Sequence, residues 1–226
     1  MPKLANKCIK SWKKFCPDYE LIEWNERNFD IEKAPLYVKQ AYEAKKWAFV
    51  SDYVRLKALY EFGGLYLDTD VEVIKPFDTS LDYDCIFGFE SIDRVSTAFI
   101  ASKKEMPILI ELLSDYDNIS FIKGDGTYDQ TTNVERITRH FLEKGLKLDN
   151  NFQIIEGVAV FPSDYFCAKS LLTDEIIITE NTFCIHNFSS SWESRYSILR
   201  GKIFKFLYRT FGEKTAMTAK KLFGRK

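Results

Sequence analysis

The sequence has few of the residues that build thiolate metal sites, disulfide frameworks or membrane spans. It contains two histidines and five cysteines, an odd number without a Cys-x-x-Cys pair, so it indicates neither a zinc site nor a disulfide framework. No apolar run comes near the roughly twenty residues of a transmembrane helix, and no apolar leader follows the first methionine. The formal net charge of −1 excludes a strongly basic nucleic-acid binder. We expect a cytoplasmic protein.

Charge is unbalanced in one place, the carboxyl-terminal segment. Residues 200–226 are rich in Lys and Arg, with Glu213 as the one acidic residue. Apolar residues, Ile203 and Leu207 among them, recur at helical spacing between those cations. We therefore expect a main domain over 1–199 and a basic amphipathic helix and tail that binds the inner face of the cell membrane peripherally. The alternative is a terminal helix packed on the core.

Apolar periodicity predicts helices interleaved with strands. The expected helices span residues 4–15, 42–62, 107–114 and 131–143. The expected strands span residues 19–23, 65–68, 71–74, 85–89, 98–101, 152–160, 176–179 and 183–186. This alternation is typical of a layered α/β domain with a largely parallel sheet.

An Asp-x-Asp motif follows an apolar strand pattern. Gly63 and Gly64 end the long predicted helix, and the strand after them leads into Asp68 and Asp70. Alternate side chains of a strand share a face, so we expect the two carboxylates to point the same way. Paired carboxylates suit a hard ion such as Mg²⁺ or Mn²⁺, which also binds phosphate oxygens. The motif alone is weak, since it also occurs in solvated turns, but the preceding apolar strand favours a metal site.

A second polar group lies near the middle of the long predicted helix. Ser51, Asp52 and Arg55 are spaced to share one helical face. Apolar residues surround them in the sequence, which predicts burial, and a buried charged pair requires a ligand or a polar network. The alternative is a solvated surface ion pair.

Together these motifs resemble a known enzyme family. Ser51-Asp52-x-x-Arg55 followed by Gly63-Gly64-x-Tyr66-x-Asp68-x-Asp70 resembles the sugar-binding DXD region of glycosyltransferase family 32. It is also similar to the catalytic domain of the large clostridial glucosylating toxins, and the resemblance extends from about Cys8 to Trp192. It implies a GT-A (Rossmann-like) fold, a UDP- or GDP-linked sugar donor, and a Mn²⁺ or Mg²⁺ ion. It further implies hexose transfer with retention to a glycan or lipid-linked saccharide in surface polysaccharide synthesis.

The resemblance also implies residue roles. Asp52, Arg55, Asp68 and Asp70 would form the catalytic group. The donor would be bound by Ser51, Asp52, Arg55, Tyr66, Asp68, Ser191 and Trp192. The metal would be held by Asp68, Asp70 and His186, with Asp70 as a direct ligand and Asp68 on ribose or on metal-bound water.

Two departures from the family pattern define the alternatives. The family begins with a strand that is not apparent before the first predicted helix, so we expect part of the nucleobase pocket to be missing. Thr97-Ala98 stands where the family tends to have an Asn-Gly or Asn-Thr pair near the acceptor, so no acceptor residue is assigned. The Gly124-Asp125-Gly126 turn, with Asp129 and Gln130 after it, is a candidate lining of the acceptor side. The first departure leaves open a weak or inactive relative that binds a sugar nucleotide or a partner.

A more distant alternative is a haloacid-dehalogenase-type phosphohydrolase with Asp68 as nucleophile. That family expects Thr or Val two residues after the second Asp, where this chain has Glu72. It also leaves Ser51, Asp52 and Arg55 without a role, which disfavours it.

Overall fold

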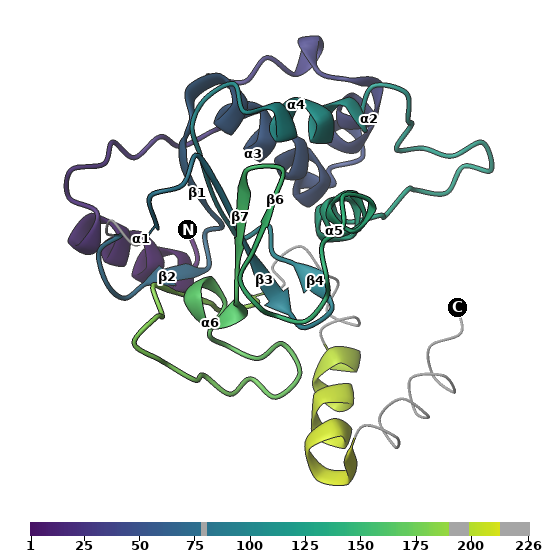
Figure 1. The fold of residues 1–226 in the computed structure, drawn as a ribbon. Helices are drawn as coiled ribbons and strands as arrows, with labels where there is room; N and C mark the ends of the chain where they lie inside the picture. The colour runs from purple at the N-terminus through teal and green to yellow at the C-terminus, as the bar shows by residue number, and fades with distance from the viewer. Residues whose placement is uncertain (78–80, 190–198, 213–226) are drawn as a thin grey trace.

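Helices pack on both faces of a mixed β-sheet (Figure 1). The computed structural model describes residues 1–77, 81–189 and 199–212. The helices are α1 (Lys3–Phe15), η1 (Ile31–Lys33), α2 (Leu36–Glu43), α3 (Trp47–Phe62), α4 (Pro107–Ser114), α5 (Asn133–Glu143), α6 (Ser163–Phe166) and an unlabelled helix over 199–212. The strands are β1 (Gly64–Leu67), β2 (Val71–Val73), β3 (Cys85–Ser91), β4 (Arg94–Val95), β5 (Phe99–Ser102), β6 (Gln153–Ile155), β7 (Val158–Phe161) and β8 (Cys184–His186).

The main sheet has the order β1-β5-β3-β7-β6, with β4 paired to β3, and β2 and β8 form a separate ribbon. Among the described strands, β3 and β7 form the one parallel pair. The prediction of a largely parallel sheet is therefore wrong. One reason is that the strand predicted over 152–160 is a hairpin, in which Glu156 and Gly157 turn the chain with φ of 49° and 83°.

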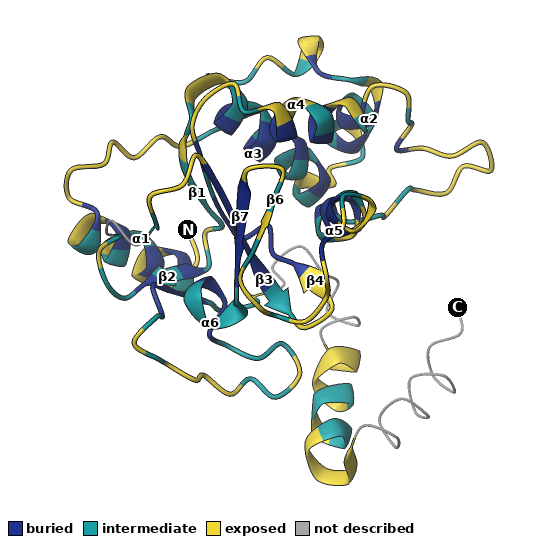
Figure 2. Cartoon of the chain, in the orientation of Figure 1, coloured by how far each residue is buried: buried dark blue, intermediate teal, exposed yellow. Residues whose placement is uncertain are grey.

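The alternating side chains of β3 divide the core in two. Phe87 and Phe89 pack with α2, α3, α4 and α5 on one face of the sheet. Ile86 packs on the other face with α1, α6 and the β2-β8 ribbon, and a Cβ at Gly88 would meet the Phe166 ring at 2.8 Å. Figure 2 shows the buried residues concentrated in the sheet and on the inner sides of the helices.

Most of the predicted helices are confirmed, with one important change. The predicted helix over 42–62 is two helices, because the chain breaks between α2 and α3, where Lys45 has φ 56°. Ser51 and Asp52 therefore lie in the first half of α3 rather than near the middle of a longer helix. Gly63 ends α3 as expected: its φ is 68°, and a Cβ there would lie 2.7 Å from the Lys104 backbone nitrogen.

The strands predicted over 19–23 and 176–179 are wrong. The described backbone forms no ladder at either place, apart from an isolated bridge between Lys169 and Ile176. Their apolar side chains, such as Leu21 and Ile177, are exposed. An apolar run forms a strand only when a neighbouring strand pairs with it. No strand pairs with either of these two runs among the described residues.

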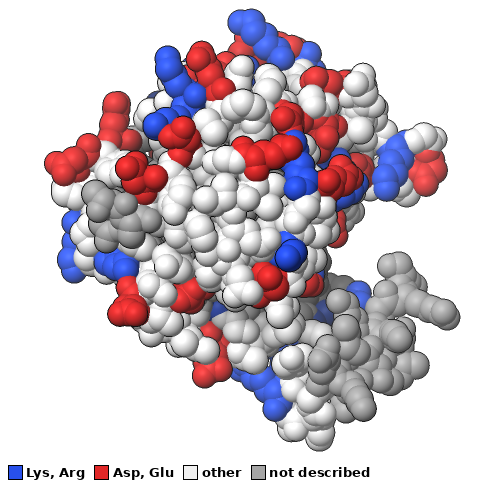
Figure 3. Space-filling view, viewed as in Figure 1, with Lys and Arg blue, Asp and Glu red and all other residues white. Residues whose placement is uncertain are grey.

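The described part of the chain has no helix that could span a membrane, and the face drawn in Figure 3 carries no field of one charge. No helix in it is long and apolar enough to cross a bilayer. Acidic and basic side chains intermingle over the face drawn in Figure 3. Within the same residues β1 pairs with β5 alone, and an apolar hollow beside its Gly64 end is lined by residues that include Tyr19, Leu65 and Phe99. None of the predicted site residues lines this hollow.

Candidate active site

The two carboxylates of the Asp-x-Asp motif are brought together by a turn. Strand β1 ends at Leu67, and the Val71 backbone N–H donates to the Asp68 carbonyl at 2.9 Å as the chain turns into β2. Asp68 and Asp70 thus converge on one site, although by a tight turn rather than by the alternation of a strand. Their side chains are 28% and 13% exposed, so both are open to a ligand.

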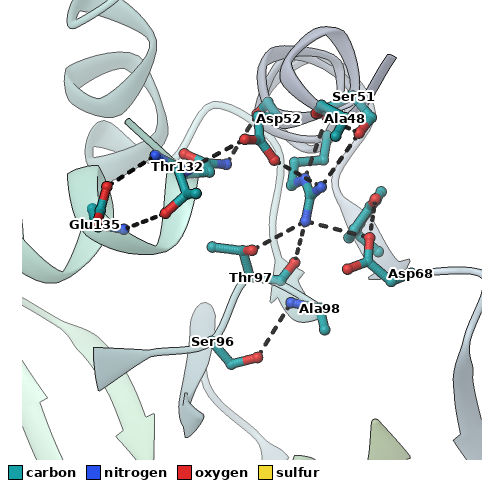
Figure 4. Close-up of polar contacts among 12 residues, drawn as sticks. Ala48, Ser51, Asp52, Asp68, Ser96, Thr97, Ala98, Thr132 and Glu135 are labelled. Atoms are coloured by element: carbon teal, nitrogen blue, oxygen red, sulfur yellow. Dashed lines mark hydrogen bonds and ion pairs between the residues drawn. The ribbon is translucent and has the colours of Figure 1, made fainter. Parts of the chain in front are cut away.

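Arg55 is the centre of a buried polar network (Figure 4). Its side chain is 5% exposed and lies 2.9 Å from the Asp52 carboxylate and 3.4 Å from the Asp68 carboxylate. It donates to the Thr97 carbonyl at 2.7 Å and hydroxyl at 3.1 Å, and to the Ser51 carbonyl at 3.3 Å. Sequence reasoning missed Thr97, whose contribution comes largely through its backbone. The guanidinium is thereby held in one orientation.

Tyr66 supports this network from β1. Its hydroxyl donates to Asp68 Oδ1 at 2.6 Å, and its ring lies 4.7 Å from the Arg55 guanidinium carbon. Burial opposes the charge of Arg55, but the neighbouring carboxylates Asp68 and Asp52 outweigh it and raise the Arg55 pKa. Arg55 therefore remains positively charged and holds Asp68 in place.

The amino end of α5 meets Asp52 from the other side. The Asn133 backbone N–H donates to Asp52 Oδ2 at 3.2 Å, and its amide donates to the Asp52 carbonyl at 3.0 Å. The helix begins here because Thr132 and Glu135 form a capping box. Burial raises the pKa of Asp52, and the Arg55 charge opposes that shift. Sequence reasoning missed Asn133, although the Thr-x-x-Glu pattern marks the start of the helix.

Asp70 is surrounded by the segment that follows β8. The Ser189 N–H donates to Asp70 Oδ2 at 2.7 Å, the Asn187 amide donates to the Asp70 carbonyl at 2.9 Å, and His186 Nε2 lies 3.5 Å from Asp70 Oδ1. Burial disfavours the charged carboxylate, but His186 and Ser189 outweigh it and lower the Asp70 pKa to about 2. Burial likewise opposes the charged imidazole, yet Asp70 raises the His186 pKa.

The residues predicted to hold a metal do lie together. One ligand atom from each of Asp68, Asp70 and His186 lies within 4.8 Å of the others. His186 Nδ1 is buried without a hydrogen-bond partner among the described residues. Two carboxylates and an imidazole form a donor set that suits Mn²⁺, and the carboxylates also suit Mg²⁺. The residues present therefore fit a divalent cation.

Glu90, near the end of β3, is a further acidic group at this site that the motifs did not reveal. Burial raises its pKa, and His186 and Asp68 are among the charges that act on it. Its position explains the burial, because the even-numbered residues of β3 face the side of the sheet that carries the β2-β8 ribbon. Of the other predicted donor residues, Ser51 lies beside Arg55, whereas Ser191 and Trp192 fall outside the described residues.

Comparison with known proteins agrees with this geometry. A family model for the glycosyltransferase sugar-binding region containing a DXD motif matches residues 2–87. These matched residues include Ser51, Asp52, Arg55 and the Asp-x-Asp turn, whereas Thr97, Asn133 and His186 lie beyond them. Inositol phosphoceramide mannosyltransferase 3 of Schizosaccharomyces pombe (strain 972 / ATCC 24843) is 28% identical to the chain over 109 residues. These matches support a glycosyltransferase family assignment for the region that they cover.

The extent of each match limits what can be transferred to this chain. The match to the mannosyltransferase covers 46% of the chain and 30% of the relative, so the chain spans less than a third of that relative. No solved structure matches. The mixed α/β architecture is consistent with a GT-A-like fold, and a sugar-binding region of this family implies a nucleotide-sugar donor and an acceptor.

Proposed function

We propose that this protein transfers a hexose from a nucleoside-diphosphate sugar, UDP- or GDP-linked, to a glycan or lipid-linked saccharide, with retention and with Mn²⁺ or Mg²⁺. One observation carries the proposal: Asp68, Asp70 and His186 converge within 4.8 Å beside the buried Arg55 network. Surface polysaccharide synthesis is the process to which we assign it. The name of the fission yeast relative favours a mannose donor and a lipid-borne acceptor.

The metal-site residues and the Arg55 network have separate tasks in this proposal. Asp68, Asp70 and His186 would hold the ion, which when bound acts as a Lewis acid toward the departing diphosphate. Arg55 keeps Asp68 oriented through its 3.4 Å contact. Asp52, 14% exposed and fixed by Arg55 and Asn133, would accept hydrogen bonds from hydroxyls of the donor sugar.

The test is binding and slow hydrolysis of a panel of UDP- and GDP-hexoses that includes GDP-mannose, with Mn²⁺, with Mg²⁺ and with chelator. We expect one preferred donor, metal-stimulated release of nucleoside diphosphate, and a loss of about 100-fold or more in Asp70→Asn. The matched control is Asp93→Asn, because Asp93 is an exposed carboxylate near the end of β3 that pairs with Arg94. It should retain wild-type activity.

The same panel separates the proposal from its alternatives. Donor binding without any turnover would indicate an inactive relative and would refute catalysis by this chain. Absence of binding to folded protein would refute the donor site itself. Hydrolysis of simple phosphate esters that requires Asp68 would favour the phosphohydrolase instead.

A further inference from the structure

Two neighbouring segments expose a group of large apolar side chains. One segment is the loop after α6, and the other is the helix over 199–212, at the lower end of the molecule in Figure 1. The exposed residues are Leu172, Ile176, Ile177, Ile178, Leu199, Ile203, Phe206 and Phe211. Contiguous apolar exposure of this kind on a protein surface marks an interaction site.

The loop and the helix are joined by ion pairs. Asp174 in the loop accepts from Lys205 at 2.8 Å and from Arg209 at 2.6 Å, and Lys169 lies 3.4 Å from the same carboxylate. Three cations therefore surround one acidic residue. The two exposed apolar segments are thus held next to each other by side chains from both.

The exposed face of the helix has the pattern of an interfacial helix. Leu199, Ile203 and Phe206 recur at intervals of four and three residues and so share one face, where Ile203 is 51% and Phe206 is 62% exposed. Lys202 and Arg209, seven residues apart, border one side of this apolar face in the helical arrangement. An apolar face bordered by cations is what binds a bilayer surface that carries negative charge.

We propose that the loop over 172–178 and the helix over 199–212 form one docking surface for the anionic surface of a lipid bilayer. Charge favours lipid over a second copy of the chain. The helix carries Lys202, Lys205 and Arg209 without an acidic residue, and a second copy would bring the same cations against them. Glu175 and Glu180 are exposed at the two ends of the isoleucine run, so the isoleucines contribute apolar contact and the helix contributes charge.

The experiment is co-sedimentation of the full chain with phosphatidylcholine vesicles, with and without phosphatidylglycerol. We expect binding to the anionic vesicles that falls about tenfold in Ile203→Ser/Phe206→Ser and also falls in Ile177→Ser. Lys202→Glu should weaken binding to anionic vesicles and make the remaining binding less sensitive to salt. The control is Ile110→Ser, because Ile110 is 48% exposed on α4, far from this surface in the sequence. It should bind as the wild type does.

Each of three other outcomes overturns the proposal. If the wild-type protein does not bind anionic vesicles, the proposed docking surface does not exist. If Ile177→Ser binds as the wild type does, the loop over 172–178 is not part of that surface. A dimer in sedimentation velocity that dissociates in the same variants, without any lipid binding, identifies a second copy as the occupant. Hydrolysis of the sugar nucleotide in the absence of vesicles serves as a folding check, since none of these variants touches Asp68, Asp70 or His186.

Discussion

The Arg55 cluster (Ser51, Asp52, Arg55, Asp68 and Thr97) and the Asp70–His186 pair are neighbours that differ in how fully their polar atoms are used. Each nitrogen of the Arg55 guanidinium has a protein partner. Within the pair, His186 and Asp70 meet in a single 3.5 Å contact, and although Ser189 also donates to Asp70, His186 Nδ1 has no hydrogen-bond partner among the described residues. A fully satisfied network acts as a scaffold, whereas buried unsatisfied polar atoms mark the place where a ligand adds contacts.

The Arg55 cluster and the Asp70–His186 pair also differ in the elements that build them. The partners of Arg55 come from α3, β1 and the residues just before β5. These segments pack together in one hydrophobic core. The pair joins a turn to a strand from the far end of the domain, and that strand is held through the short β2-β8 ribbon. We therefore expect changes in the Arg55 cluster to affect folding first and changes in the pair to affect ligand binding first.

The largest expected effect comes from breaking the scaffold. Arg55→Leu leaves the buried Asp52 carboxylate and the partly buried Asp68 carboxylate without a counter-charge, which should lower the unfolding free energy by about 3 to 5 kcal/mol. Urea unfolding measures this loss in unfolding free energy. Lys57→Leu on the same helix removes an exposed pair with Glu61 and should cost under about 1 kcal/mol. Equal effects of the two substitutions would show that the Arg55 cluster is not a scaffold.

If Arg55→Leu does not fold, Arg55→Lys provides the same comparison. Lysine keeps the charge but cannot reproduce the several directed hydrogen bonds of a guanidinium. We expect a folded protein of intermediate stability. A variant as stable as the wild type would show that charge alone, and not the hydrogen bonds to Thr97 and Ser51, supports the site.

The next effect lies in the ligand-binding pair. Asp70→Asn should lower Mn²⁺ affinity by about 100-fold, because it removes one charge of the donor set while keeping its shape. The measurement is the rise in melting temperature with added Mn²⁺, which should be present in wild type and in Asp93→Asn but nearly absent in Asp70→Asn. A rise that survives in Asp70→Asn places the ion elsewhere.

Local patterns made part of this site predictable. Ser51, Asp52 and Arg55 lie within one turn of a helix, and Asp68 and Asp70 lie two residues apart, so spacing alone brings each set together. Asn133 and Thr97 gave no comparable signal. Asn133 contributes through a helix start and Thr97 through a backbone carbonyl, and both depend on contacts between distant segments. The partner of Asp70 was identified through the family resemblance, since a lone histidine near a strand end is ordinarily structural.

The same distinction applies to the fold. Helices 107–114 and 4–15 were predictable because helical periodicity is local. The hairpin between β6 and β7 could have been found, since Glu156-Gly157 interrupts the apolar run with a turn signal. The direction in which β3, β5 and β7 pair depends on contacts far apart in the chain. The periodicity of a single strand does not indicate the direction in which that strand pairs.

A pH effect of about 2 kcal/mol should distinguish the pair in metal-free protein. The pKa of Asp70 is lowered to about 2, so its stabilisation is present above its unfolded value near about 4 and is lost as the pH falls toward 2. The pKa of His186 is raised, so its stabilisation is present below about 6.5 and is lost as the pH rises through the raised value. The stabilisation should therefore be greatest between about pH 4 and 6.5.

The measurement is the difference in unfolding free energy between wild type and Asp70→Asn in chelator, from below about pH 4 to above about pH 6.5. It should shrink on both sides of the maximum. In a His186→Gln background the decline at high pH should disappear while the decline at low pH remains. A difference that does not change with pH would mean that Asp70 and His186 do not interact as charges.

The smallest effect is expected from Asn133, at the edge of the Arg55 cluster. Asn133→Ala removes the amide that donates to the Asp52 carbonyl and the oxygen that accepts from the Tyr116 hydroxyl at 3.3 Å. Because these partners are buried, we expect a loss of about 1.5 kcal/mol in unfolding free energy. The α5 backbone N–H still reaches Asp52 in this variant, so Arg55 keeps its partner and the melting-temperature rise with Mn²⁺ should be unchanged.

Asn151→Ala, at an exposed asparagine, should fall within about 0.5 kcal/mol of wild type. If Asn133→Ala instead abolished the Mn²⁺ response at little cost in stability, the scaffold and the ligand-binding pair would be one unit and the division drawn between them would be wrong.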